Sequence, residues 1–206
     1  MKILDFPQGS DEWLASRAGK VTASRLADVM AKIKSGEAAA RSDYRAQIIA
    51  EVLTGVPQSD GYTNAAMQWG VDTEASARNA YEAATGVLVE EVGLVIHPRI
   101  ERSGASPDGL AGDGLLEIKC PKTATHIQYL TANTVPAKYK YQMLWQMACT
   151  QRSWCDFVSF DPRLPEDLQL FLIRFDRDDK KIEEMEKEVI LFLSEVDEVI
   201  STLRKA

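Results

Sequence analysis

The sequence predicts an α/β fold in which a small mixed sheet is flanked by helices. Three observations lead to this expectation: capped helical segments fill the first 85 residues, short strands follow, and helices and strands then alternate to the end. The chain has 206 residues, of which 45% are hydrophobic, so it can bury one substantial core. We therefore expect a single domain over residues 1–206.

Residues that favour helix ends divide the first 85 residues. A side chain that can accept a hydrogen bond precedes each of the first three segments, and glycine follows two of the four. The expected helices run from Ser10 to Arg17, from Thr22 or Ser24 to Lys34, from Ser42 to Gly55, and from Ala65 to Ala84. We expect the last of these to be broken or strained near Gly70 and to stop at Gly86.

Short apolar runs beyond Gly86 predict strands, and two longer segments between them predict helices. The expected strands are Val87–Val92, a piece before Ser106, Leu115–Cys120, Trp154–Phe160 and Leu168–Phe175. The expected helices are Thr125–Thr131, Tyr139–Thr150 and Asp178–Leu203. The last carries an apolar stripe of Ile182, Met185, Val189, Phe192, Val196, Val199 and Leu203. A stripe of this length favours docking on the chain's own core over a coiled-coil seam.

Composition excludes several classes of protein. No stretch approaches the ~18 apolar residues of a membrane span, and the first residues lack the apolar core of a secretion signal. Cys120, Cys149 and Cys155 are too few and too irregularly spaced for a disulfide framework, a paired zinc motif or a four-cysteine iron–sulfur cluster. We expect a soluble cytoplasmic protein with no membrane partner.

The formal net charge of −7 argues against a protein that coats nucleic acid through a broad basic surface. The charge is unevenly distributed, however. Residues 1–50 and 119–163 are mildly basic and lie on either side of a strongly acidic stretch, residues 51–118. This pattern suits acidic residues that collect cations between segments that touch phosphate, although an ordinary solvated surface would give the same balance.

The chemistry is concentrated in Ser106-Pro107-Asp108-Gly109 and Leu115-Leu116-Glu117-Ile118-Lys119-Cys120-Pro121. Residues two apart in a strand face the same side, so Glu117 and Lys119 project together while Ile118 faces the core. A hairpin through the glycine-rich turn would bring Asp108 beside Glu117. Two carboxylates, with the main-chain carbonyl of Ile118, suit Mg²⁺, and two such ions suit in-line attack on a phosphodiester. Lys119 could orient the attacking water and offset charge on the phosphate.

Without context, this pattern would be ordinary, because Asp-Gly is a common turn and Glu and Lys often pair on an exposed strand face. The order PD-x(n)-E-x-K, with a turn between its parts and a hydrophobic strand around the second, resembles the PD-(D/E)xK nuclease superfamily. That resemblance implies a restriction-endonuclease-like core.

Further blocks resemble one branch of this superfamily, the lambda exonuclease (YqaJ-type viral recombinase) family. In order they are Trp13-Leu14-Ala15-Ser16-Arg17-Ala18-Gly19, Val21-Thr22-Ala23-Ser24, Trp69-Gly70 with Glu74, the two segments above, and Tyr141-Gln142. The resemblance implies a phage or prophage nuclease domain that degrades one strand of linear double-stranded DNA from 5′ to 3′ with two Mg²⁺ ions, for which Mn²⁺ is a possible substitute. It also implies a homotrimer, double-stranded DNA ends as substrate, and a phage single-strand annealing protein as partner.

The resemblance also implies roles for individual residues. Asp108 and Glu117 match metal ligands, Lys119 the catalytic lysine, Glu74 a further acidic residue near the metals, and Gln142 a glutamine on the helix behind the site. The positions matching the 5′-phosphate pocket, and so the substrate-binding set, are Arg17, Thr22, Ser24 and Ser106. Ordinary interpretations stay open for several: Glu74 as a solvated helix charge, Arg17 as a helix-end charge, and Ser24 as a helix cap.

Core packing is the favoured interpretation of Trp13 and of Met67, although Met67 aligns with the apolar wedge that opens the duplex in this family. His97 and His126 have no partner spacing and receive no metal role. The run from Lys138 to Tyr141 fits a DNA-facing surface and an amphipathic helix start equally well.

Two rival functions stay open: a structure-specific endonuclease or junction resolvase on the same site, and a catalytically silent DNA-end-binding module. Binding alone does not require Lys119, so its presence beside both carboxylates counts against the silent module.

Overall fold

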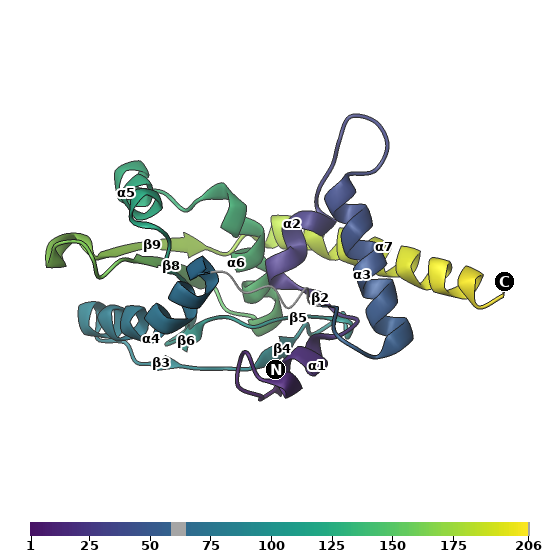
Figure 1. Ribbon diagram of the computed structural model, residues 1–206, viewed down its shortest axis with the longest axis horizontal. Coiled ribbons are helices and arrows are strands. Elements are labelled where there is room, and N and C mark those ends of the chain that lie inside the picture. Colours follow the sequence, from purple (N-terminus) through teal and green to yellow (C-terminus); the bar gives the residue numbers. More distant parts are fainter. Residues whose placement is uncertain (59–64, 206) are drawn as a thin grey trace.

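Two mixed sheets flanked by helices form the frame of the computed structural model, which describes residues 1–58 and 65–205 (Figure 1). The larger sheet has the order β3-β6-β7-β8-β9, with bounds Val89–Glu90, Gly109–Ala111, Gly114–Lys119, Trp154–Phe160 and Leu170–Asp176. The smaller has the order β1-β4-β5-β2, with bounds Lys2–Leu4, Leu94–Ile96, Ser103–Ala105 and Val21–Thr22. The predicted α/β class is confirmed, and the strands are divided between two sheets.

Seven α-helices and two short 3₁₀ turns are found in the described ranges. The helices are α1 (Asp11–Arg17), α2 (Leu26–Val29), α3 (Ala39–Thr54), α4 (Ala65–Thr85), α5 (Thr123–Ala132), α6 (Ala137–Thr150) and α7 (Asp179–Leu203). The 3₁₀ turns are η1 (Ala23–Arg25) and η2 (Glu166–Leu168). No helix of the described part is both long and apolar enough to cross a membrane.

The centre of the larger sheet is the parallel pair β7 and β8, joined by a crossover through α5 and α6. The strands outside this pair run antiparallel to their neighbours. Parallel strands end at the same edge of a sheet, and that edge is where α/β proteins place their ligands. Lys119, at the end of β7, and Asp161, directly after β8, therefore lie at one edge.

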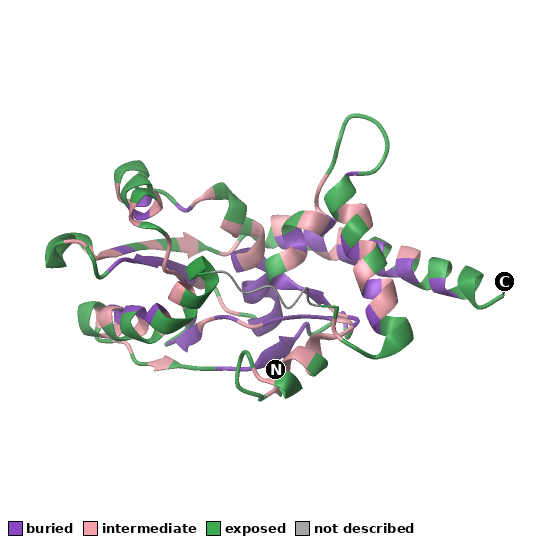
Figure 2. Cartoon of the chain, viewed as in Figure 1, coloured by how far each residue is buried: buried purple, intermediate pink, exposed green. Residues whose placement is uncertain are grey.

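The core lies between the sheets and the helices that cover them, and it includes β7, β8 and most of α6 (Figure 2). Eight consecutive residues of α6, from Met143 to Thr150, are buried. Helix α7 docks on this core as predicted, with Ile182, Met185, Val189, Phe192 and Val196 all buried. Farther along α7, Val199 and Leu203 are exposed and Ile200 takes the buried position, so the stripe shifts by one residue.

Several local predictions near the N-terminus need correction. Ser10 caps α1, as predicted, by accepting a hydrogen bond from the N–H of Trp13. The helix expected to run to Lys34 is wrong, because Val21–Thr22 pairs with β5 as a strand and α2 already ends at Val29. Helix α3 begins at Ala39, before Ser42, and ends at Gly55 in a left-handed conformation as predicted.

The predicted break near Gly70 is also wrong, because α4 runs without interruption from Ala65 to Thr85 and Gly86 follows it with a φ of 70°. The predicted strand Val87–Val92 is shorter than expected, since only Val89–Glu90 pairs with β6 and the chain then enters β4 at Leu94.

Candidate active site

Asp108 and Glu117 meet because the predicted hairpin forms. Gly109 of β6 pairs with Leu116 of β7, which places Asp108 at the start of this ladder. The N–H of Asp108 donates to the carbonyl of Leu116 at 3.2 Å, and the N–H of Ile118 donates to Asp108 Oδ2 at 2.6 Å. The structure thus brings both carboxylates to one end of β7.

Glu117 lies in a polar cradle and has no exposed surface. Gln142 Nε2 donates to its Oε1 at 2.7 Å, and Gln146 Nε2 donates to its Oε2 at 2.6 Å. The ammonium of Lys119 forms an ion pair with the same carboxylate. Gln142 therefore lies where the sequence placed it, behind the site, whereas Gln146 was not predicted although it stands four residues further along the same helix face.

The electrostatics of this group favour a bound cation. Burial, followed by repulsion from Glu117, raises the pKa of Asp108 well above its usual value. Burial alone would lower the pKa of Lys119, but the attraction of Glu117 and Asp108 outweighs it and raises that pKa. Lys119 therefore stays protonated. Asp108 lies near two other carboxylates, those of Glu117 and Glu74, and the single charge of Lys119 does not balance both of them.

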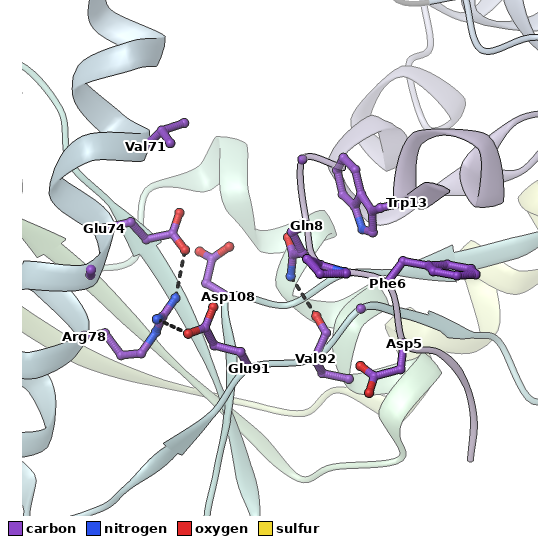
Figure 3. Close-up of a pocket in the computed structure, with 14 residues that line it drawn as sticks. Asp5, Phe6, Gln8, Trp13, Val71, Glu74, Arg78, Glu91, Val92 and Asp108 are labelled. Carbon is purple, nitrogen blue, oxygen red and sulfur yellow. Dashed lines mark hydrogen bonds and ion pairs between the residues drawn. The ribbon is translucent and has the colours of Figure 1, made fainter. Parts of the chain in front are cut away.

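A cavity of about 790 Å³ opens in front of Asp108 (Figure 3). Glu74, from α4, lies on its opposite wall, and the carboxylates of Glu74 and Asp108 point toward one another. Arg78, one turn after Glu74, donates to Glu74 at 3.1 Å and to Glu91 at 2.6 Å. Burial raises the pKa of Glu74. The predicted acidic residue thus faces the site, held by an arginine that the sequence did not indicate.

Asp108 and Glu117 supply the carboxylate oxygens that Mg²⁺ prefers, and Mg²⁺ typically uses one or two carboxylates and keeps several waters. In the described chain, no three or more His, Cys, Asp or Glu side chains lie close enough together to hold an ion, so water and main-chain oxygens would complete the ligand set. The N–H of Ile118 donates a hydrogen bond to Asp108. Ligation of a metal ion by the carbonyl of Ile118 stays a prediction.

A second cavity, of about 440 Å³, is lined by three of the four predicted phosphate-binding residues, Arg17, Thr22 and Ser24. Arg17 Nη2 donates to Thr22 Oγ1 at 3.4 Å. Burial lowers the pKa of Arg17, but a guanidinium remains charged at any ordinary pH. Lys20 and Arg25, which the sequence analysis did not single out, line the same cavity.

Trp13 connects the two cavities. It lines the larger one, the guanidinium of Arg17 lies 4.1 Å above its ring, and its Nε1 donates to Ser106 Oγ at 3.0 Å. Ser106 is therefore linked to the other three phosphate-binding candidates through Trp13, and it does not line their cavity. The expectation that Trp13 packs in the core is wrong, because the residue is only partly buried and belongs to neither cluster of buried core residues.

Met67 was also expected in the core, but its side chain is 54% exposed and it lines the second cavity. His97 stacks on Trp145, and His126 is held between the hydroxyl of Ser159 and the carbonyl of Leu168. These histidine contacts belong to the packed interior.

The run from Lys138 to Tyr141 lies in the first turns of α6, and a DNA-facing role for it stays a prediction. Tyr139 stacks on Phe157 with ring centroids 5.4 Å apart, which is core packing, and its ring also lies 5.3 Å from Lys119 Nζ.

Gln8 is a further unpredicted neighbour of the site. Its Nε2 donates to the carbonyl of Pro107 at 2.8 Å, and Pro107 directly precedes Asp108.

Comparison with known proteins identifies the family of this chain. Residues 12–153 match the model of the YqaJ-like viral recombinase domain. Two structures of LHK-Exo, an alkaline exonuclease from Laribacter hongkongensis, are 51% identical to this chain and cover 95% of it and 97% of their own length. Their TM-scores are 0.89, for the complex with dAMP, and 0.88.

A phage-related exonuclease from Haemophilus somnus 129PT, 17% identical, shares the fold with a TM-score of 0.71 over 89% of this chain and 96% of its own. No match is found among curated proteins. The family model covers well over half of the chain, and the likeness to LHK-Exo extends over nearly all of it. The chain belongs to the YqaJ-like viral recombinase family.

Proposed function

We propose that this protein is a magnesium-dependent exonuclease that degrades one strand of linear double-stranded DNA from its 5′ end and leaves a 3′ single-stranded tail. The observation that carries the proposal is the convergence of Asp108, Glu117 and Lys119 beside a large cavity. The likeness to an alkaline exonuclease supports it. The dAMP bound to that relative is a deoxynucleoside monophosphate, the class of product that stepwise DNA hydrolysis releases.

Asp108 and Glu117 would hold Mg²⁺, with the carbonyl of Ile118 as a further ligand and Glu74 as the acidic residue across the cavity. Two ions are proposed, and Mn²⁺ is a possible substitute. When bound, Mg²⁺ supplies Lewis-acid polarisation of the scissile phosphate and a lower pKa for the attacking water. Gln142 and Gln146 keep the Glu117 carboxylate in one orientation by occupying one side of each oxygen.

Lys119 would act as a cation and not as a base, because its carboxylate neighbours raise its pKa and keep it protonated. Its ammonium can donate a hydrogen bond to the attacking water and offset the charge that builds up on the phosphate in the transition state.

The second cavity would bind the terminal 5′-phosphate through Arg17, Thr22 and Ser24. A terminal phosphate carries more charge and more free oxygens than an internal diester, and a guanidinium can bind it bidentately. Ser106 and Trp13 link this pocket to the cavity in front of Asp108. The bound chain end would then set the register of the first scissile bond over the metal site.

Family resemblance extends the proposal to the biological setting. The protein would act in the cytoplasm of a bacterial host on the DNA of a phage or prophage. It would work as a homotrimer beside a phage single-strand annealing protein, which would take up the 3′ tail.

The test is a cleavage assay on linear duplex labelled at a single 5′ end, with Mg²⁺, with Mn²⁺ and with a chelator. Covalently closed circular duplex is the second substrate, because an endonuclease or resolvase can cut it although it has no free end. We expect mononucleotide release from the linear DNA alone, and only with metal. Equal cutting of the closed circle would favour the endonuclease instead.

Asp108→Asn, Glu117→Gln and Lys119→Met should each lower the rate by on the order of a thousandfold or more while keeping the fold, because they remove metal or transition-state contacts. Asp113→Asn is the matched control, since Asp113 is an exposed aspartate in the turn at the far end of β7. Wild-type activity in any of the first three variants would remove the basis of this proposal.

A further inference from the structure

An arginine outside the predicted motifs contacts two elements that carry residues of the candidate site, the segment after β7 and helix α4. Asp161 follows β8 directly and has no exposed surface. Arg163 binds it through two side-chain bonds, Nε to Oδ1 at 2.7 Å and Nη2 to Oδ2 at 2.9 Å, and its own N–H also donates to Oδ1 at 3.0 Å. The guanidinium is therefore held in one orientation by a buried carboxylate.

That orientation directs Arg163 to two other elements. Its Nη2 donates to the carbonyl of Pro121 at 3.1 Å, two residues beyond Lys119. Its guanidinium carbon lies 4.4 Å above the ring of Trp69, on α4 and five residues before Glu74. One side chain thus joins the end of β8, the segment after β7 and the first turns of α4.

Two of these elements carry groups that must keep their spacing for the proposed catalysis. Lys119 enters the site from β7, and Glu74 enters it from α4 on the opposite wall of the cavity. In-line attack tolerates little displacement, since a shift of about 1 Å in a reacting or orienting group can cost about a hundredfold in rate.

We infer that Arg163 is a positioning residue that holds the Lys119–Pro121 segment and helix α4 at a fixed separation through Asp161, Pro121 and Trp69. This inference rests on the proposed nuclease function, because the separation matters through the reaction at Lys119 and Glu74. Removal of the guanidinium should therefore lower kcat and leave KM for DNA nearly unchanged.

The chain contains a matched control. Arg174 binds the buried Asp156 in the same bidentate manner, at 2.9 and 3.0 Å, and lies 3.6 Å above the ring of Trp154. The two arginines are also similarly exposed, at 45% for Arg163 and 52% for Arg174. Arg174 lies on β9 of the larger sheet, and its partners Asp156 and Trp154 lie on β8, away from the segments next to Lys119 and Glu74.

The kinetic test compares Arg163→Ala, Arg163→Lys and Arg174→Ala by kcat, KM and thermal midpoint. We expect Arg163→Ala to lower kcat about ten- to a hundredfold with KM within about twofold. Arg163→Lys should restore the thermal midpoint more than kcat, because lysine can pair with Asp161 but cannot also bind Pro121 in the same geometry. Arg174→Ala should lower the thermal midpoint by a similar amount and leave kcat unchanged.

Three results would overturn the inference: an unchanged kcat in Arg163→Ala, a rise confined to KM, or an equal loss of kcat in both alanine variants. A second measurement separates this failure from failure of the proposed function. Amide hydrogen exchange over residues 65–74 and 119–123 should be faster in Arg163→Ala than in wild type and unchanged in Arg174→Ala. Unchanged exchange in Arg163→Ala refutes the positioning role, whereas an inactive wild type refutes only the nuclease.

Discussion

At the scale of single residues, the proposed chemistry depends on a carboxylate, that of Glu117, which the fold removes from water. A buried, charged Glu117 is stable only when its oxygens are paired, and Gln142, Gln146 and Lys119 pair them. Family resemblance placed Gln142 there, but nothing in the sequence singled out Gln146. Eight consecutive residues of α6 are buried, so helical periodicity does not distinguish a residue that faces Glu117 from one that faces the core.

Gln146→Leu tests this pairing. The change keeps the volume of the side chain but removes a 2.6 Å hydrogen bond from a buried carboxylate, which should lower the free energy of unfolding by roughly 1–3 kcal/mol. We also expect kcat to fall about tenfold, because Glu117 would lose the contact that fixes Oε2. Thermal unfolding and steady-state kinetics measure the two effects. Gln128→Leu is the control, since Gln128 is an exposed glutamine on α5; a Gln146 variant with wild-type kcat would contradict the expectation.

Arg17 permits a second test at this scale. Removing one charged contact of this kind costs on the order of 1.5–3 kcal/mol, so Arg17→Ala should slow cleavage of 5′-phosphorylated duplex roughly ten- to a hundredfold. Duplex with a 5′-hydroxyl should be affected much less. Arg25→Ala is the control in the same cavity, because Arg25 is already paired with Asp28 and Gln47. An equal slowing of both substrates by Arg17→Ala would make Arg17 a structural residue.

At the scale of secondary-structure elements, the length of an element decided how well the sequence predicted it. The long periodic segments that became α7, β7 and β8 were predicted to within about a residue at each end. Strands of two or three residues carry no detectable period and exist only through their partners. Val21–Thr22 shows this, because it is a strand only by pairing with Ser103 and Gly104, more than 80 positions away.

Helix α4 supports a prediction about stability. The helix is continuous through Gly70, and a Cβ atom added there would meet nothing within 4 Å. Gly70→Ala should therefore raise the free energy of unfolding by about 1 kcal/mol, a gain of about 2–4 °C in thermal midpoint for a chain of this size. Gly93→Ala should do the opposite, because its Cβ would lie 2.3 Å from the carbonyl oxygen of Leu4. A lower thermal midpoint for Gly70→Ala would contradict this expectation and show that helix α4 requires glycine at this position.

At the scale of the whole molecule, the sequence located the candidate catalytic residues but not the cavities around them. The hairpin logic for Asp108, Glu117 and Lys119 needs only local pairing, and the structure has that pairing. The link through Trp13 between the two cavities depends on α1, β2 and β5 meeting in space, which no local pattern encodes. For the same reason the sequence favoured burial for Trp13 and Met67, as it would for any large apolar residue away from a motif.

The net charge of −7 motivates the last prediction, which concerns assembly. Affinity for duplex DNA comes largely from neutralised phosphates and falls steeply with salt, so a single acidic chain should hold DNA weakly. A closed homotrimer around the duplex would prevent the DNA from escaping by topology and would need fewer phosphate contacts.

We expect light scattering to give three times the chain mass of 22.9 kDa. We also expect cleavage that has begun to continue after excess competitor DNA and added salt block new binding. The same mass measurement on Asp108→Asn is the control, because that change lies in the catalytic cavity and should leave assembly intact. A monomer mass at the concentration where cleavage is processive would refute the closed assembly.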